Sequence, residues 1–182
     1  MNLLTEIRLG GSGGQGLILA GIILAEAAIL DGKNSIQTQS YGPEARGGSS
    51  KAEVIISNEP ILYPKVIKPD ILLALAKQAY LYYNNDVKKN GIIIVDDSIN
   101  TFESDNHKII KLPIIHTAQN VIGKSFVANI ISLGVLVELT KVVTKKSLEK
   151  AVLNRVPPGT EELNKSALET GYSLVINYKR SN

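Results

Sequence analysis

Cysteine and tryptophan are absent from this chain of 182 residues, and phenylalanine occurs only twice. Without cysteine the chain can form no disulfide, and it offers no thiolate to a zinc ion or an iron–sulfur cluster. So few aromatic side chains leave little to stack against nucleic-acid bases. Basic residues exceed acidic ones by 20 to 17, and a net charge of +3, evenly spread, does not indicate nucleic-acid binding.

Long apolar runs are also scarce. The longest, residues 17–30, is interrupted by Glu26 and is shorter than the roughly 20 residues that a membrane span needs. The first twenty residues show no signal-peptide pattern, because their apolar run follows a glycine loop and has no cleavage site. Apolar residues make up 44% of the chain, enough for a buried core. We therefore expect one domain over residues 1–182, located in the cytoplasm.

Apolar patterns and turn residues predict alternating strands and helices. Continuous apolar runs such as "DILLALA" and "GIIIVDD" are typical of strands buried on both faces of a parallel sheet. The alternation predicts a Rossmann-like α/β fold, doubly wound in three layers, with a mostly parallel sheet and helices on both faces. The expected strands are residues 5–9, 34–41, 50–57, 70–76, 91–97 and 107–113. The expected helices are residues 15–30, 77–90, 117–121, 125–141, 145–154 and 160–170.

Two of the expected helices are apolar on all sides. "LILAGIILAEAAIL" carries one charge in its fourteen residues, and residues 126–139 are interrupted only by Asn129, Ser132 and Glu138. A helix on the surface is normally apolar on one face only, so these two need cover on every side. We expect another polypeptide to provide part of that cover, which favours an oligomer.

A glycine loop, "GGSGGQG", joins the first strand to the first helix at residues 10–16. The residues Gly11, Ser12, Gly13, Gly14, Gln15 and Gly16 satisfy G-x-G-x-x-G, in the place that a dinucleotide fingerprint requires. Glycines let a ligand approach the backbone, and the helix N-terminus beyond offers free N–H groups to an anion.

The second half of that fingerprint is missing. A nicotinamide site needs Asp or Glu at the end of the second strand, where this chain has Gln37 and Gln39, and Asp31 lies in the turn before it. Two interpretations therefore stay open for the loop: it binds another phosphate or carboxylate, or its glycines only allow tight packing of strand and helix. A self-contained nucleotide-binding oxidoreductase is the remote alternative.

A second glycine loop, "SYGPEARGGSS", follows the second expected strand at residues 40–50. Its candidate binding residues are Tyr41, Gly42, Glu44, Arg46, Gly47 and Gly48. Arginine offers a planar, permanently charged group that suits a phosphate or a carboxylate. Ligands of open parallel sheets bind beyond the carboxyl ends of the strands. We expect the two loops to follow neighbouring strands and to form one rim.

The two loops together carry a resemblance. "GSGGQGLILAGIILAEAA", "QTQSYGPEARGGSSKAEVIIS", "YPKVIKPDILLAL", "NIISLGVLVEL" and "GTEELNKSALETGY" resemble the gamma subunit of the 2-oxoacid:ferredoxin oxidoreductases over nearly the whole chain. The similarity is greatest to the 2-oxoglutarate synthase branch, in which gamma is a separate polypeptide. The pyruvate, ketoisovalerate and indolepyruvate enzymes carry related domains and remain the alternative.

The resemblance implies a role inside a larger enzyme. That enzyme decarboxylates a 2-oxoacid on thiamine diphosphate, passes electrons through iron–sulfur clusters to ferredoxin and forms an acyl-coenzyme A. Thiamine diphosphate and Mg²⁺ would lie in alpha and beta subunits, and the clusters in beta or in a ferredoxin-like delta subunit. The gamma chain would bind no cofactor by itself and would contribute to assembly and to the coenzyme A path. Arg46 would then face coenzyme A or substrate, or would hold a subunit interface with Glu44 or a partner carboxylate.

The remaining candidates have simpler structural interpretations. For His107 and His116 we expect structural roles, because no third metal ligand lies at a matching spacing. Asp96 and Asp97 could be read as a magnesium pair, but we expect a helix or turn cap. Asn129 is expected to be a bonded core amide. Tyr80, Tyr82 and Tyr83 fit either an interface or a plain amphipathic helix.

Overall fold

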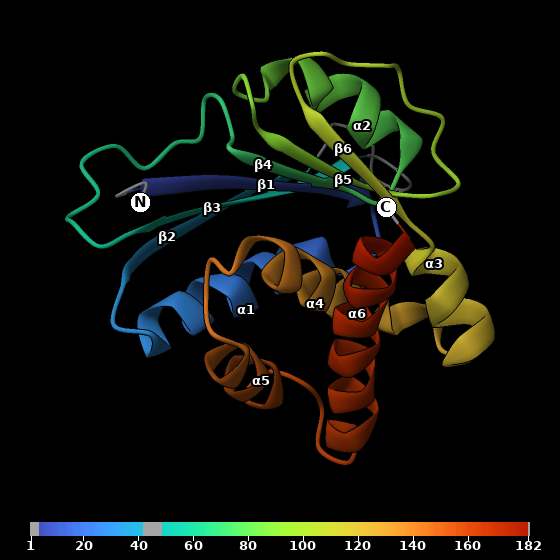
Figure 1. Ribbon diagram of the computed structural model, residues 1–182. Helices are drawn as coiled ribbons and strands as arrows, with labels where there is room; N and C mark the ends of the chain where they lie inside the picture. The colour runs from blue at the N-terminus through green and yellow to red at the C-terminus, as the bar shows by residue number, and fades with distance from the viewer. Residues whose placement is uncertain (1–3, 42–48, 182) are drawn as a thin grey trace.

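The computed structural model describes residues 4–41 and 49–181. Its centre is a six-stranded sheet (Figure 1). The order of the strands across the sheet is β2-β3-β1-β4-β5-β6. Their bounds are β1 Leu4–Ser12, β2 Asn34–Tyr41, β3 Ser49–Ser57, β4 Ile71–Ala74, β5 Ile92–Asp96 and β6 Lys108–Leu112.

The sheet is mixed, although five of its strands run in one direction. β1, β4, β5 and β6 pair in parallel, and β3 is antiparallel to both of its neighbours, β1 and β2. The expectation that the two glycine loops follow neighbouring strands is therefore wrong, because β3 returns between β1 and β2. β1 and β3 pair along their whole lengths, from Leu4 opposite Ser57 to Ser12 opposite Ser49.

Helices cover both faces of the sheet, as the expected three-layer fold requires (Figure 1). α2 lies over one face, and α1, α4, α5 and α6 lie on the other. Among the described residues, no helix is long and apolar enough to cross a membrane. The α-helices are α1 Leu17–Leu30, α2 Lys77–Tyr83, α3 Ile114–His116, α4 Ala128–Thr140, α5 Lys145–Leu153 and α6 Glu161–Ser181, and the short turns are η1 Asn84–Asp86, η2 Thr117–Val121 and η3 Ser125–Val127.

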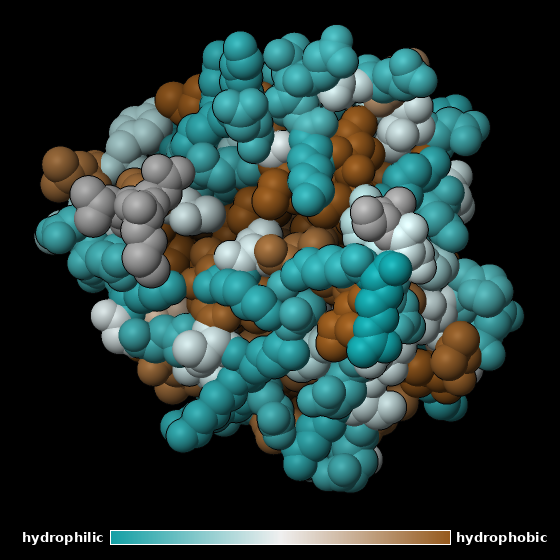
Figure 2. All heavy atoms as spheres, in the orientation of Figure 1, coloured by the Kyte–Doolittle hydropathy of each residue, from teal (hydrophilic) through white to brown (hydrophobic). Residues whose placement is uncertain are grey.

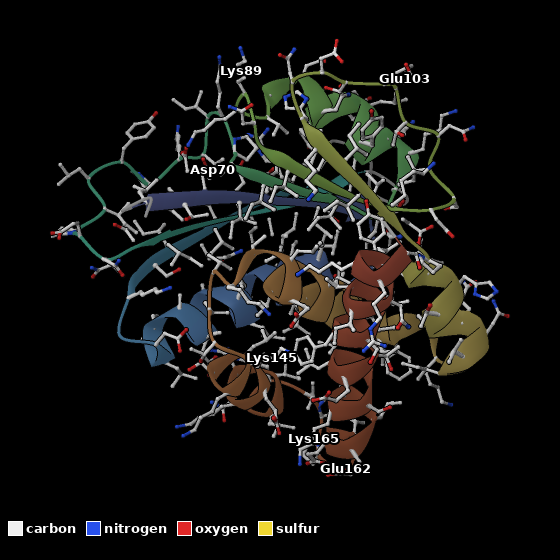
Figure 3. The ribbon with its side chains drawn as sticks, viewed as in Figure 1. Asp70, Lys89, Glu103, Lys145, Glu162 and Lys165 are labelled. Atoms are coloured by element: carbon white, nitrogen blue, oxygen red, sulfur yellow. The ribbon has the colours of Figure 1, made fainter. Side chains whose placement is uncertain are left out.

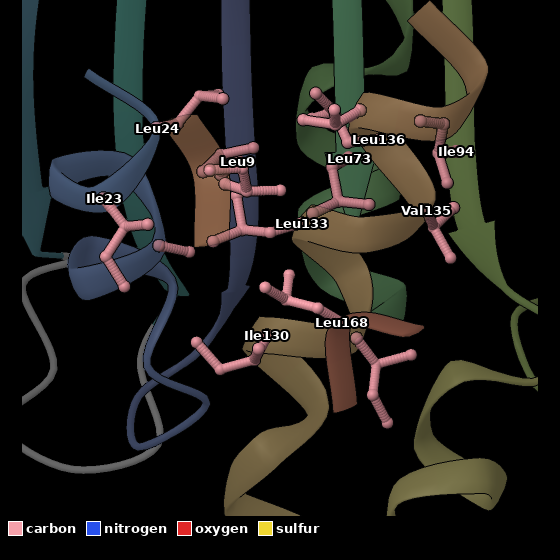
Figure 4. Close-up of a cluster of buried hydrophobic side chains, with 14 of the residues drawn as sticks. Leu9, Ile23, Leu24, Leu73, Ile94, Ile130, Leu133, Val135, Leu136 and Leu168 are labelled. Carbon is pink, nitrogen blue, oxygen red and sulfur yellow. The ribbon is translucent and has the colours of Figure 1, made fainter. Parts of the chain in front are cut away.

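The main core lies between the sheet and the α4 layer. Figure 4 shows Leu9, Leu73 and Ile94 of the sheet facing side chains of α4 such as Leu133 and Leu136. All five are fully buried. Their neighbours on the strands alternate to the other face, where a smaller cluster around Leu72, Tyr80 and Ile93 packs beneath α2. Strands such as β4 and β5 are thus apolar on both faces, which explains why their sequences are continuous apolar runs.

The two all-apolar helices find much of their cover within this chain. α1 contacts β2 and β3 on one side and α5 on the other, and α4 packs against α6. The expectation that another polypeptide supplies this cover is wrong for α4, whose residues from Ala128 to Glu138 are all buried here. Most of α1 also needs no cover from another polypeptide, because its exposed apolar residues are mainly Ile29 and Leu30 in the last turn. The apolar character of these helices therefore does not by itself indicate an oligomer.

α4 and α6 approach each other at two glycines. A Cβ atom on Gly134 would lie 2.6 Å from the carbonyl oxygen of Leu168, and one on Gly171 would collide with the carbonyl oxygen of Ile131. The expected helix of residues 160–170 ends just before Gly171, yet α6 continues to Ser181. Gly171 is the point of closest contact between two helices rather than the end of one.

Candidate functional site

The first glycine loop lies at the edge of the sheet where β1 and β2 end, which we call the carboxyl edge. β1 extends further than expected and includes Gly10, Gly11 and Ser12. The loop itself is therefore short, from Gly13 to Gly16, and α1 begins directly after it at Leu17. Gly14 and Gly16 have φ angles of 90° and 71°, which only glycine adopts without strain.

Gln15 holds this loop against the sheet. Its Oε1 accepts a hydrogen bond from the backbone N–H of Ser12 at 2.7 Å, and its Nε2 donates to the carbonyl of Leu75 at 3.0 Å. A Cβ atom on Gly11 would collide with the Gln15 side chain, so Gly11 leaves room for it. The Gln15 amide is thus engaged in shaping the loop.

Asn129 links the same loop to the start of α4. Its Nδ2 donates to the carbonyl of Gly16 at 3.2 Å, and its Oδ1 accepts from the N–H of Ile130 at 2.9 Å. A Cβ atom on Gly16 would lie 2.6 Å from that Nδ2, so Gly16 is required for its contact as well as for its φ angle. Asn129 is a bonded core amide, as expected, and it makes the loop part of the helical layer.

A shallow pocket of about 230 Å³ opens beside the loop. The N-cap residue of α1 is Gly16, which has no side chain to cap the helix, and no hydrogen bond from a described side chain caps its start. Ser50 of β3 donates its hydroxyl to the carbonyls of Gly11 and Ser12, at 3.4 and 3.3 Å. The described lining is mostly apolar, its polar groups are backbone atoms and the Ser50 hydroxyl, and none of the described lining side chains is charged. The lining residues are Gly13, Gly14, Gly16, Leu17, Ile18 and Ser50.

The second glycine loop falls outside the described residues. Residues 42–48 include Gly42, Glu44, Arg46, Gly47 and Gly48, and the Tyr41 side chain is likewise outside the description. The backbone ends that flank the loop are described: Tyr41 pairs with Ser50, and Ser49 pairs with Ser12. Both flanks therefore reach the carboxyl edge beside the first loop.

The sheet order argues against a nicotinamide site. In the dinucleotide fingerprint the acidic side chain that binds the ribose comes from the strand next to β1. Here β2, which carries Gln37 and Gln39, is separated from β1 by β3. The Gln37 amide donates to the carbonyl of Thr38 at 3.2 Å.

Asp31, the acidic residue in the turn before β2, is a turn residue as expected. Its carboxylate accepts hydrogen bonds from the N–H and hydroxyl of Thr144 at 2.6 and 2.7 Å. Partial burial alone would raise the pKa of Asp31, but hydrogen bonds from Ser147 and Thr144 hold it below its usual value.

Asp96 acts as a cap, as expected. Its carboxylate accepts from the N–H and hydroxyl of Ser98, and from the N–H of Ile115 at the start of α3, 2.7 Å away. Among the described residues, no group of three or more His, Cys, Asp or Glu side chains is placed to hold a metal ion.

The two histidines differ in their surroundings. His107 has both ring nitrogens bonded, to the Ser104 hydroxyl and the Val87 carbonyl, each at 3.1 Å, which confirms a structural role. His116 is exposed at the end of α3.

The sequence patterns did not reveal a buried charge cluster on the α2 face of the sheet. Arg8 lies opposite Glu53 in the β1–β3 register, and its Nε donates to Glu53 at 2.8 Å. Its other nitrogens donate to Asp86 at 2.6 Å and to the carbonyl of Val66 at 3.2 Å. The guanidinium also lies 5.0 Å from the centre of the Tyr83 ring. Charged residues within the two strands, among them Arg8 in β1 and Glu53 in β3, are the available signal, but the pairing of these two becomes evident only with the sheet order.

The chain matches a known protein family over most of its length. The family described as "Pyruvate ferredoxin/flavodoxin oxidoreductase" matches residues 6–174. The chain belongs to this family. The 2-oxoglutarate synthase subunit KorC of Methanocaldococcus jannaschii is 53% identical over 173 residues, which cover 93% of this chain and 92% of KorC.

A solved member of the family has the same fold. The gamma subunit of a keto/oxoacid ferredoxin oxidoreductase from Geobacter sulfurreducens aligns with a TM-score of 0.86 at 48% identity, covering 96% of this chain and 97% of that one. Family members named for another substrate are more distant. The pyruvate synthase subunit PorC of Methanothermobacter marburgensis is 32% identical, over 92% of this chain and 95% of PorC.

Proposed function

We propose that this chain is the gamma subunit of a 2-oxoglutarate:ferredoxin oxidoreductase and is inactive alone. The complete enzyme converts 2-oxoglutarate, coenzyme A and oxidised ferredoxin into succinyl-coenzyme A, CO₂ and reduced ferredoxin. The observation that carries this proposal is the 53% identity with KorC along almost the whole chain. A pyruvate, ketoisovalerate or indolepyruvate enzyme is the alternative, and the lower identity with PorC makes the pyruvate branch the weaker choice.

The chemistry in this proposal takes place on other chains. Thiamine diphosphate and Mg²⁺ bind to the alpha and beta subunits, and iron–sulfur clusters lie in beta or in a ferredoxin-like delta subunit. The complete absence of cysteine from this chain supports that division, because clusters are held by thiolates. The complex works in the cytoplasm, in a cell with anaerobic or low-oxygen metabolism.

The carboxyl edge is the part of the chain that faces the coenzyme A path and the partner subunits. Two features support this role: the pocket at the uncapped start of α1, and the end of β2 beside it. The N–H groups of a helix start favour an anion such as a phosphate of coenzyme A. Because the described pocket contains no cation, Arg46 of the second loop would have to supply the positive charge.

Replacing Arg46 in the assembled enzyme tests this role. If Arg46 contacts coenzyme A, Arg46→Ala raises the KM for coenzyme A about tenfold, the effect of one lost charged contact, with the complex intact. If Arg46 holds an interface, the complex loses this subunit instead. Arg180→Ala, an exposed arginine near the end of α6, is the matched control and should change neither quantity. An Arg46→Ala enzyme with normal assembly and normal KM would contradict both roles.

The substrate branch is tested on the same complex, purified without oxygen. We expect ferredoxin reduction to be fastest with 2-oxoglutarate and much slower with pyruvate, 3-methyl-2-oxobutanoate or indolepyruvate. A preference for any of the other three 2-oxoacids would contradict the 2-oxoglutarate branch while leaving the gamma-subunit proposal standing.

A further inference from the structure

The segment between β3 and β4, residues 58–70, exposes large apolar side chains. Leu62 is 94% exposed, Ile67 65% and Tyr63 56%. Figure 1 shows the segment standing out from the sheet, and in Figure 2 hydrophobic residues project at that border of the molecule. Single exposed apolar residues are ordinary, but three within six positions of one segment indicate a contact surface.

The ends of this segment are firmly held. Near its start, the N–H of Glu59 donates to the Ser57 hydroxyl at 3.0 Å. At its end, the N–H of Asp70 donates to the carbonyl of Glu6 at 2.8 Å, and Lys88 bonds to both carboxylate oxygens of Asp70 at 3.1 Å (Figure 3 labels Asp70). Prolines 60, 64 and 69 further restrict the backbone between these points.

The middle of the segment is anchored by the buried charge cluster. Val66 is only 6% exposed, and its carbonyl accepts a hydrogen bond from the Arg8 guanidinium. Glu53 and Asp86 hold that guanidinium in place. The inner side of the segment is therefore fixed while Leu62, Tyr63 and Ile67 point away from the core. A surface that is already ordered loses little conformational entropy on binding.

The charges next to the apolar residues indicate the kind of partner. Lys65 and Lys68 are exposed, and within the described part of the chain neither takes part in an ion pair. Lys65 and Lys68 outnumber Glu59, an exposed carboxylate of the same segment, so two copies of the segment facing each other would carry an excess of like charge, which disfavours a second copy. Carboxylates on a different chain would complement the two lysines.

We propose that the 58–70 segment is a docking surface for another subunit of the oxidoreductase. The partner offers an apolar recess to Leu62, Tyr63 and Ile67, and carboxylates to Lys65 and Lys68. The segment follows Ser57, which pairs with Leu4 at the start of β1, so it leaves the sheet at the edge opposite the glycine loops. The chain thus meets its partners at two opposite edges. This inference rests on the proposed function, which makes the chain a subunit.

Co-purification of the full chain with its partner subunits tests the inference. The triple variant Leu62→Ser/Tyr63→Ser/Ile67→Ser should reduce recovery of partner subunits at least about tenfold, because apolar anchors dominate such contacts. Its melting temperature as a free chain should stay unchanged, since all three side chains are exposed. Lys65→Glu/Lys68→Glu should also weaken recovery, most strongly at low salt. The control Ile29→Ser/Tyr82→Ser/Ile176→Ser changes three exposed apolar residues elsewhere and should have no effect.

The outcomes separate this inference from the proposed function. If wild type brings down partner subunits and the triple variant does so equally well, the docking surface is wrong and the proposed function stands. If wild type brings down no other subunit, the proposed function fails, and the inference fails with it. A wild-type homodimer that the triple variant abolishes would identify a second copy as the occupant and would overturn the inference.

Discussion

Arg8 connects three parts of the chain that are distant in sequence. Its guanidinium bonds Glu53 of β3, Asp86 of η1 and the carbonyl of Val66, and it is only 4% exposed. A buried charge is costly unless it is paired and hydrogen-bonded, and here the guanidinium has all three partners around it. The cluster fixes how the segment before β4 lies on the sheet.

Replacing Arg8 alone should therefore destabilise the fold. Arg8→Met leaves Glu53, 7% exposed, with Lys51 as its remaining cation, and we expect unfolding in urea to require about 3 kcal/mol less. The double variant Arg8→Met/Glu53→Leu removes both charges and should recover most of that loss. A single variant as stable as wild type would show that the cluster contributes nothing to folding.

At the scale of elements, apolar patterns predicted the six strands and most helices but not the strand order. β3 carries an alternating pattern that fits an edge strand or a central one equally well, so its insertion between β1 and β2 could not be read from it. The apolar surface of α4 predicts an external partner, but α6 of the same chain covers it. Sequence patterns show that a face is buried, but not which element buries it.

The contact of α4 with α6 gives a prediction for these elements. Gly171→Ala places a methyl group against the carbonyl of Ile131 and forces the helices apart. We expect a loss of about 2 kcal/mol in the free energy of unfolding, although alanine is the better helix former. Ser173→Ala, on an exposed position of the same helix, is the control and should be neutral or slightly stabilising. An equal response of the two variants would mean that the helices do not meet as closely as described.

At the scale of the whole molecule, the position of the candidate site was predictable and its construction was not. G-x-G-x-x-G after a strand correctly placed the first loop at the carboxyl edge. The hydrogen bond from Asn129 to Gly16 spans 113 positions in the sequence, and no local pattern reveals such a contact. The ligand roles of Gly11, Ser12, Gly13, Gly14, Gln15 and Gly16, and those of the second loop, stay predictions.

Both proposed contact surfaces lie at edges of the sheet. The glycine loops are at the carboxyl edge, and the 58–70 segment leaves the opposite edge. The large helical layer between them is packed mainly against itself and the sheet. This arrangement suits a subunit that bridges neighbours through its two edges.

The most direct test of this account is recovery of the tagged chain from its native cell without oxygen, followed by mass identification of what accompanies it. The account predicts a thiamine-binding pair of subunits and a cysteine-rich, ferredoxin-like chain, in a complex that reduces ferredoxin with 2-oxoglutarate and coenzyme A. The chain expressed alone should show no such activity. A stable lone chain or homodimer that carries a bound nucleotide would contradict the account and would favour a self-contained nucleotide-binding oxidoreductase.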